Sequence, residues 1–121
     1  DFAPHRRRPD TVVRTPAPVV LVEGLHLLAS EAIADTLDLA VFVDACSLTR
    51  FERRLQRDVT ERARTPESVK HQFETIVEPM HARHVEPQRD RADLVLENMG
   101  EPDFEALARP VIERVETGRR K

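Results

Sequence analysis

Residues 48–64 read LTRFERRLQRDVTERAR, and this stretch decides how the rest of the chain is interpreted. It carries six arginines and three acids, in a chain whose formal net charge is −3. On a helical wheel of about 100° per residue, the apolar side chains fall in one narrow stripe. They are Leu48, Phe51, Leu55 and Val59. We therefore predict a helix that buries this stripe.

The arginines of this helix are predicted to lie away from the stripe. Those on the opposite side are Arg50, Arg53, Arg57 and Arg64, with Arg54 on the flank. Arg62 would return to the apolar side, which a guanidinium should avoid. We therefore predict that the helix loosens near Thr60 and leaves residues 61–64 in a mobile segment.

A solvated basic face is the alternative interpretation of this pattern. Three features favour an anion-binding role instead. The cations are all arginine, whose planar fork suits phosphate oxygens. They outnumber the neighbouring acids, and they run into a segment of the kind that closes over phosphates. The sequence therefore predicts an anionic ligand.

Composition limits the class of protein. A chain of 121 residues with 34% charged and 40% hydrophobic residues fits one domain with a moderate core, not a membrane or disordered protein. We see no secretory signal, and a chain that starts with Asp1 is expected to be a fragment or a processed product. The lone Cys46 fits a cytoplasmic setting. The absence of Trp and Tyr argues against a stacking surface for single-stranded nucleic acid.

Apolar runs predict three strands of a parallel sheet. The run VVLV, residues 19–22, has no polar alternation, as expected for a strand covered on both faces. Residues 39–43 form a second such run, and a third short strand lies within residues 92–96. Residues 1–18, rich in arginine and proline, are predicted to form a loop or hairpin.

Capping signals place the remaining helices. Ser30 can cap a short helix through Leu37. Thr65-Pro66-Glu67 is a strong helix start, and Pro79 should kink the helix that follows. Asp103 or a neighbour opens a last helix over residues 104–115. Strands that alternate with helices in this order indicate an α/β fold with a parallel sheet.

Polar residues after the predicted strands are the candidate ligands. Glu23 directly follows VVLV and could hold Mg²⁺ through water, although an ordinary turn acid fits equally well. Asp44 has the same ambiguity and is more typical of a helix entry. His81 and His84 have a spacing that could hold a metal, but two surface residues fit the sequence better. His5, beside three arginines, could contact a small substrate.

These segments together resemble the carboxyl-terminal part of uridine–cytidine kinases, over residues 1–112. The matching pieces occur in order and are DFAPH, TVVRTPAPVVLVEG, DLAVFVD, RRLQRDVTERAR, SVKHQ, EPMHARHVEP and ADLVL. The resemblance implies a P-loop kinase-type parallel sheet with flanking helices, of which residues 1–121 form the carboxyl-terminal portion. It also implies a substrate hairpin at about residues 1–18 and a lid at about residues 54–66.

The same resemblance assigns roles to individual residues. Arg57, Arg62 and Arg64 would act on the transferring phosphates. Glu23 would lie at the Mg²⁺ site. The nucleoside would be bound by Phe2, His5, Arg54 and Gln72.

The resemblance implies ATP-dependent phosphorylation of the 5′-hydroxyl of uridine or cytidine, with ATP and Mg²⁺ as cofactors and a cytoplasmic location. From the composition we expect no membrane partner, and a nucleic-acid partner is disfavoured. The number of subunits stays open. A P-loop kinase for another small alcohol, such as a phosphoribulokinase-like enzyme, is an alternative, as are a non-catalytic nucleotide- or RNA-binding module and a structural interaction domain.

Among the departures from the family pattern, two concern the lid and the phosphate loop. The glycine usual between the two last lid arginines is Ala63, which we expect to stiffen the lid. The phosphate loop G-x-x-x-x-G-K-[ST] cannot be built from the three glycines and two lysines present, so we expect it upstream of Asp1. In the family its strand lies between those matching residues 19–22 and 39–43.

Overall fold

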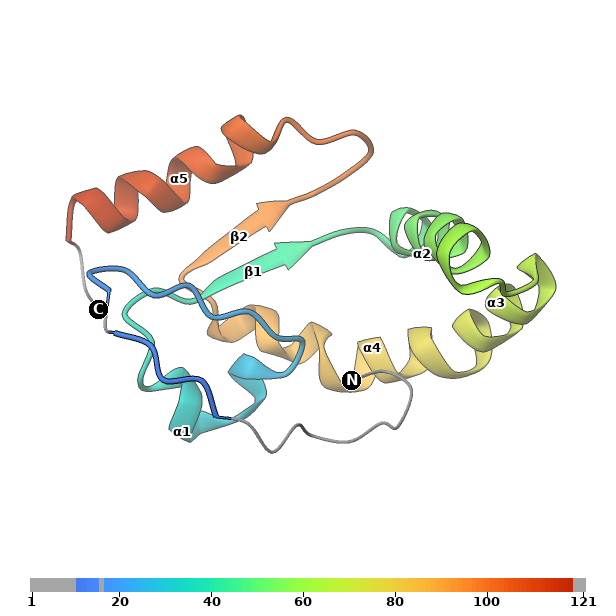
Figure 1. Cartoon of the computed structure of the whole chain (residues 1–121), viewed down its shortest axis with the longest axis horizontal. Helices are drawn as coiled ribbons and strands as arrows, with labels where there is room; N and C mark the ends of the chain where they lie inside the picture. Colours follow the sequence, from blue (N-terminus) through green and yellow to red (C-terminus); the bar gives the residue numbers. More distant parts are fainter. Residues whose placement is uncertain (1–10, 16, 119–121) are drawn as a thin grey trace.

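In the computed structural model, which describes residues 11–15 and 17–118, two parallel strands lie among helices (Figure 1). β1 (Val41–Asp44) pairs with β2 (Leu94–Glu97), and Phe42 lies opposite Val95. Parallel neighbours need a long crossover between them, which here is entirely helical apart from short connections. The α/β class and the strands predicted near residues 39–43 and 92–96 are confirmed.

Helices cover this small sheet from different sides. α5 (Phe104–Glu116) runs beside β2, whereas α4 (Glu78–His84) lies on the β1 side (Figure 1). The short helices η1 (Leu27–Ala29) and α1 (Glu31–Ala34) precede β1, and η3 (Glu86–Arg91) precedes β2. The buried apolar side chains of the described part are few. They are Leu28, Ala40, Phe42, Val69, Phe73 and Val85.

The crossover begins with α2 (Ser47–Arg62), which starts beyond the carboxyl end of β1. α3 (Pro66–Gln72) packs against α2, and the rings of Phe51 and Phe73 lie 5.2 Å apart. The hydroxyl of Thr65 accepts a hydrogen bond from the Ser68 amide, so the predicted helix start is confirmed.

Between α3 and α4 the helix widens into a π-helical segment, η2 (Phe73–Val77). Pro79 follows it in the first turn of α4. Proline has no N–H and clashes with the preceding turn of a regular helix, and a local change of helical pitch relieves that conflict. The sequence predicts a kink at Pro79, and the irregularity that the structure shows is a π turn directly before α4. Asp103 caps α5 by accepting hydrogen bonds from two backbone amides, as predicted.

The strand predicted at residues 19–22 is wrong. These residues are irregular and exposed, with Leu21 90% accessible. An apolar run becomes a strand only when a neighbour satisfies its backbone groups, and within the described residues β1 pairs with β2 alone.

Two smaller predictions concern the helix expected from Ser30 through Leu37 and the loop or hairpin expected at residues 1–18. α1 ends at Ala34, short of Leu37, and Ser30 stands at its N-cap without a side-chain hydrogen bond. Residues 11–15 form no strand, and the first ten residues of the expected hairpin are outside the described part. None of the helices in the described residues is long and apolar enough to cross a membrane.

Candidate functional site

α2 stands where parallel α/β folds place their ligand sites, beyond the carboxyl ends of the strands (Figure 1). Arg53 of α2 forms hydrogen bonds to the segment that follows β2. Its Nη2 donates to Asn98 Oδ1 at 3.0 Å and to the Gly100 carbonyl at 2.9 Å. The position of α2 relative to the sheet is thus fixed by side-chain bonds as well as by the short link from β1.

Four arginines converge on one buried carboxylate, that of Asp58, whose side chain is 0% exposed. Asp58 Oδ1 accepts from Arg57 Nε at 3.0 Å and from Arg62 Nη1 at 3.2 Å. Asp58 Oδ2 accepts from Arg64 Nη1 at 3.4 Å and lies 3.6 Å from Arg54 Nε. We call these four arginines with Asp58 the arginine cluster. One carboxylate leaves it with a large positive excess.

Gln72 joins the arginine cluster from α3. Its Oε1 accepts from Arg54 Nη2 and from Arg64 Nη1, each at 2.7 Å. The amide nitrogen of Gln72 makes no hydrogen bond to another described residue. Five predicted site residues therefore lie together, namely Arg54, Arg57, Arg62, Arg64 and Gln72.

The arginines keep Asp58 ionised. Burial alone would raise the pKa of this carboxyl, but the hydrogen bond from Arg57 and the charges of Arg54, Arg57 and Arg62 outweigh burial, so the pKa lies below its usual value. The outer guanidinium groups remain accessible to a ligand. The side chains of Arg57, Arg62 and Arg64 are 44%, 48% and 40% exposed.

The end of α2 is defined by a tight turn rather than by loosening. The helix continues to Arg62, and Ala63 then adopts the left-handed conformation with φ 51°. The carbonyl of Asp58 accepts from the amides of Ala63 and Arg64. A residue in the left-handed conformation, here Ala63, commonly ends a helix. The prediction that the helix loosens near Thr60 is wrong, because Arg62 bonds to Asp58 one turn earlier instead of entering the apolar stripe.

The prediction for the buried face of α2 is only partly right. Phe51 and Leu55 are half-buried, but Leu48 and Val59 are exposed. Arg50, predicted on the solvated side, is half-buried and bonds to Glu78 at 3.0 Å.

Asp58 itself was missed by the sequence reasoning. The available signal was the spacing of Arg54 and Arg62, one helical turn before and after it.

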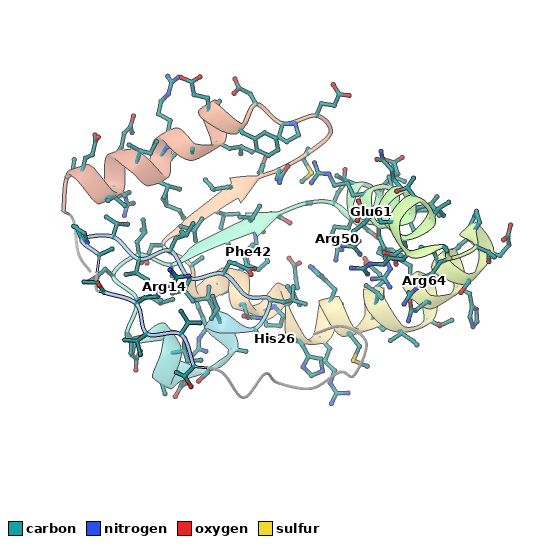
Figure 2. All side chains as sticks on the ribbon, in the orientation of Figure 1. Arg14, His26, Phe42, Arg50, Glu61 and Arg64 are labelled. Atoms are coloured by element: carbon teal, nitrogen blue, oxygen red, sulfur yellow. The ribbon has the colours of Figure 1, made fainter. Side chains whose placement is uncertain are left out.

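Figure 2 shows Arg50 and Arg64 between α2 and the α3–α4 segment, with Arg14 and His26 far from Arg64.

The remaining predicted residues lie apart from the arginine cluster or outside the described part. Glu23 is exposed, follows no strand, and makes no hydrogen bond or ion pair with another described residue. Asp44 ends β1 and lies 3.5 Å from Arg89. Phe2 and His5 are outside the described residues.

A site for Mg²⁺ is not built by these residues alone. Within residues 11–15 and 17–118, no group of three or more His, Cys, Asp or Glu side chains could hold a metal ion. Mg²⁺ often keeps its waters and takes one or two carboxylates together with substrate phosphates. The carboxylate of Glu23 is accessible and has no ion-pair partner among the residues that the structure describes, which fits that limited role.

Comparison with known proteins adds a family context. Residues 1–105 match the model of the phosphoribulokinase/uridine kinase family. A uridine kinase of Borrelia hermsii (strain HS1 / DAH) is 39% identical over 103 residues, which cover 85% of this chain and 50% of that protein. A uridine kinase of Clostridium botulinum (strain Okra / Type B1) is 37% identical over 100 residues, 83% of this chain and 48% of that protein. The chain thus spans about half the length of these relatives.

Proposed function

The chain belongs to the phosphoribulokinase/uridine kinase family, and from this premise we propose that its parent protein transfers the γ-phosphoryl group of ATP to the 5′-hydroxyl of uridine or cytidine. Residues 1–121 supply the carboxyl-terminal part of the kinase domain, with the substrate hairpin at about 1–18 and the lid at about 54–66. The arginine cluster, placed beyond the carboxyl ends of the strands, is the observation that carries this proposal.

Phosphoryl transfer asks for positioning and positive charge more than for covalent chemistry. Arg57, Arg62 and Arg64 provide accessible guanidinium groups that already share one anchor. In our proposal they bind the phosphate oxygens of ATP and stabilise the charge on the transferring group. Closing over the phosphates also excludes water that would compete with the nucleoside hydroxyl.

Arg54 and Gln72 face the nucleoside in this proposal. Because the Gln72 oxygen already accepts two arginine hydrogen bonds, its amide nitrogen is oriented as a donor. A pyrimidine offers carbonyl oxygens to such a donor. Phe2 and His5 contribute from the hairpin, a role that rests on the resemblance alone.

Glu23 holds Mg²⁺ through water in this proposal. When bound, the ion supplies charge neutralisation of the phosphates. We also propose a cytoplasmic role in pyrimidine salvage.

The test is a kinetic comparison in the full-length parent protein. Uridine and ATP are supplied, and the nucleoside monophosphate is separated and quantified. Arg57→Ala and Arg62→Ala should each lower kcat by roughly ten- to a thousandfold, the scale of losing one charged stabiliser. Lysine at either position should restore only part of the rate, because a point charge does not reproduce the guanidinium fork.

Arg83→Ala provides the matched control. Arg83 lies on α4, is exposed, and makes no hydrogen bond or ion pair with another described residue. Its removal should leave kcat unchanged. Wild-type kcat in both cluster variants would remove the lid role, and a parent protein that never phosphorylates a nucleoside would refute the proposed function.

A further inference from the structure

Among the described residues, Asp58 is the acid on which the lid arginines converge, and the family resemblance gave it no role. We propose that Asp58 is a positioning residue, which holds Arg57, Arg62 and Arg64 in the geometry that phosphoryl transfer requires. This inference rests on the proposed function. It concerns how the arginines are oriented, and it does not make Asp58 a group that touches substrate.

The side chain of Asp58 acts on both sides of the helix end. Oδ1 joins Arg57, its neighbour in sequence, to Arg62, one turn later. Oδ2 receives Arg64, which lies beyond the last residue of α2. A single rigid carboxylate thus relates arginines from the helix and from the turn that follows it.

The backbone of Asp58 adds a second constraint. Its carbonyl accepts from the Ala63 amide and, at 3.1 Å, from the Arg64 amide. These bonds fix the turn from which the Arg64 side chain projects. Backbone and side chain of one residue therefore determine the position of the last lid arginine.

Neither favourable hydration nor charge balance explains why the carboxylate of Asp58 lies at this position. A fully buried carboxylate loses its hydration and needs paired donors in return. It neutralises only one of four neighbouring cations, so the arginine cluster stays strongly positive. What the carboxylate adds is a common acceptor that holds the guanidinium groups in fixed orientations.

The positioning role predicts a split between binding and turnover. Asp58→Asn keeps the shape of the side chain and removes its negative charge. The cluster then gains net positive charge, so KM for ATP should stay equal or fall. The guanidinium groups lose their common charged acceptor, so kcat should fall roughly ten- to a hundredfold, because small misplacements of catalytic groups are costly.

The experiment measures kcat and KM for ATP in wild-type and Asp58→Asn full-length parent protein, with Arg62→Ala and the double variant. If Asp58 acts through Arg62, the fold-decrease of kcat in the double variant Asp58→Asn/Arg62→Ala should be much smaller than the product of the fold-decreases in the two single variants. Rates are expressed per folded molecule, so a merely structural role would lower the melting temperature and leave kcat unchanged.

Three results separate the possibilities. A kcat within twofold of wild type in Asp58→Asn overturns the positioning role, as does a double variant whose losses multiply. A wild-type parent without kinase activity refutes the proposed function instead.

One measurement needs no substitution and applies if Asp58→Asn does not fold. The Nε proton of Arg57 donates to Asp58, so in ligand-free wild-type protein it should exchange with solvent at least tenfold more slowly than that of the exposed Arg83. Equal exchange rates for Arg57 and Arg83 would also overturn the inference.

Discussion

Ala63 holds a backbone conformation that side chains disfavour, between two arginines of the cluster. Its φ of 51° lies in the left-handed region, where a Cβ costs about 1–2 kcal/mol relative to glycine. Ala63→Gly removes this strain but gives the unfolded chain more freedom, which offsets part of the gain. We expect a net stabilisation of about 0.5–1 kcal/mol, measured by urea unfolding of the full-length parent.

Gly100 supplies the reciprocal control for this prediction. It has φ +56°, and a Cβ added there would meet no atom of the other described residues within 4 Å, its two chain neighbours aside. Gly100→Ala should therefore destabilise the protein by about 1 kcal/mol through backbone strain alone. A destabilising Ala63→Gly would show that the turn is held by something other than its conformational preference.

His81 should make stability depend on pH. Burial lowers the pKa of its imidazole, the charge of Arg50 lowers it further, and the nearby Glu86, Glu78 and Asp44 only partly oppose this. The unfolded chain then binds the proton more tightly than the folded chain. Stability is therefore complete above the ordinary histidine pKa of about 6.5 and is lost as pH falls from there toward the lowered folded value.

The measurement for His81 is the free energy of unfolding of the full-length parent at about pH 7.5 and 5.5. His81→Gln should reduce the difference between the two values, because one titrating group has been removed. His71→Gln is the control, since His71 is exposed on α3. An unchanged pH difference in His81→Gln would exclude His81 as its source.

At the residue scale, the sequence identified the arginines but not their partners. Their type and number were visible locally, and so was the excess of positive charge. Glu78, which binds Arg50, is 28 positions away, so no helical wheel could find that pair. The i,i+4 rule could have paired Asp58 with Arg54 and Arg62. Asp58 was instead counted as one of the local acids and was not recognised as the centre of the arginine cluster.

At the scale of elements, the contact between α2 and α3–η2 depends on Phe73. Its side chain is 6% exposed and packs on Phe51. Phe73→Ala should destabilise the full-length parent by about 3–5 kcal/mol, the usual cost of truncating a buried phenylalanine. Chemical denaturation measures the loss.

Phe104 is the matched control for Phe73. It opens α5 and is 73% exposed, so Phe104→Ala should change stability by no more than about 0.5 kcal/mol. Equal losses in the two variants would mean that Phe73 is not a packing residue in solution, or that Phe104 is covered by a part of the parent.

Helix starts were predicted well because their signals are local. Thr65 and Asp103 each satisfy backbone amides within a few residues of themselves. The strand prediction for residues 19–22 was wrong for the opposite reason. A strand needs a partner strand to pair with, and the local composition does not show whether one is present. The π turn before Pro79 was also beyond the sequence, which predicted a kink at the proline and not a change of helical pitch before it.

At the scale of the whole molecule, the described core is small for the length of the chain. Six apolar residues are buried among those described, whereas all four residues of the run at 19–22 are exposed. The two-stranded sheet has an unpaired edge on each side within the described residues. The matched stretch covers about half of each relative, which fits our proposal that a preceding part of the parent contributes further strands and the phosphate loop.

We therefore expect residues 1–121, prepared alone, to be poorly stable. Exposed apolar runs and open strand edges favour association between copies. Circular dichroism should show a broad or absent thermal transition, and light scattering should show self-association. The full-length parent is the control and should unfold in one sharp transition. A sharp, cooperative transition from a monomer of residues 1–121 would contradict this expectation, because the chain would then form a complete core without strands from elsewhere.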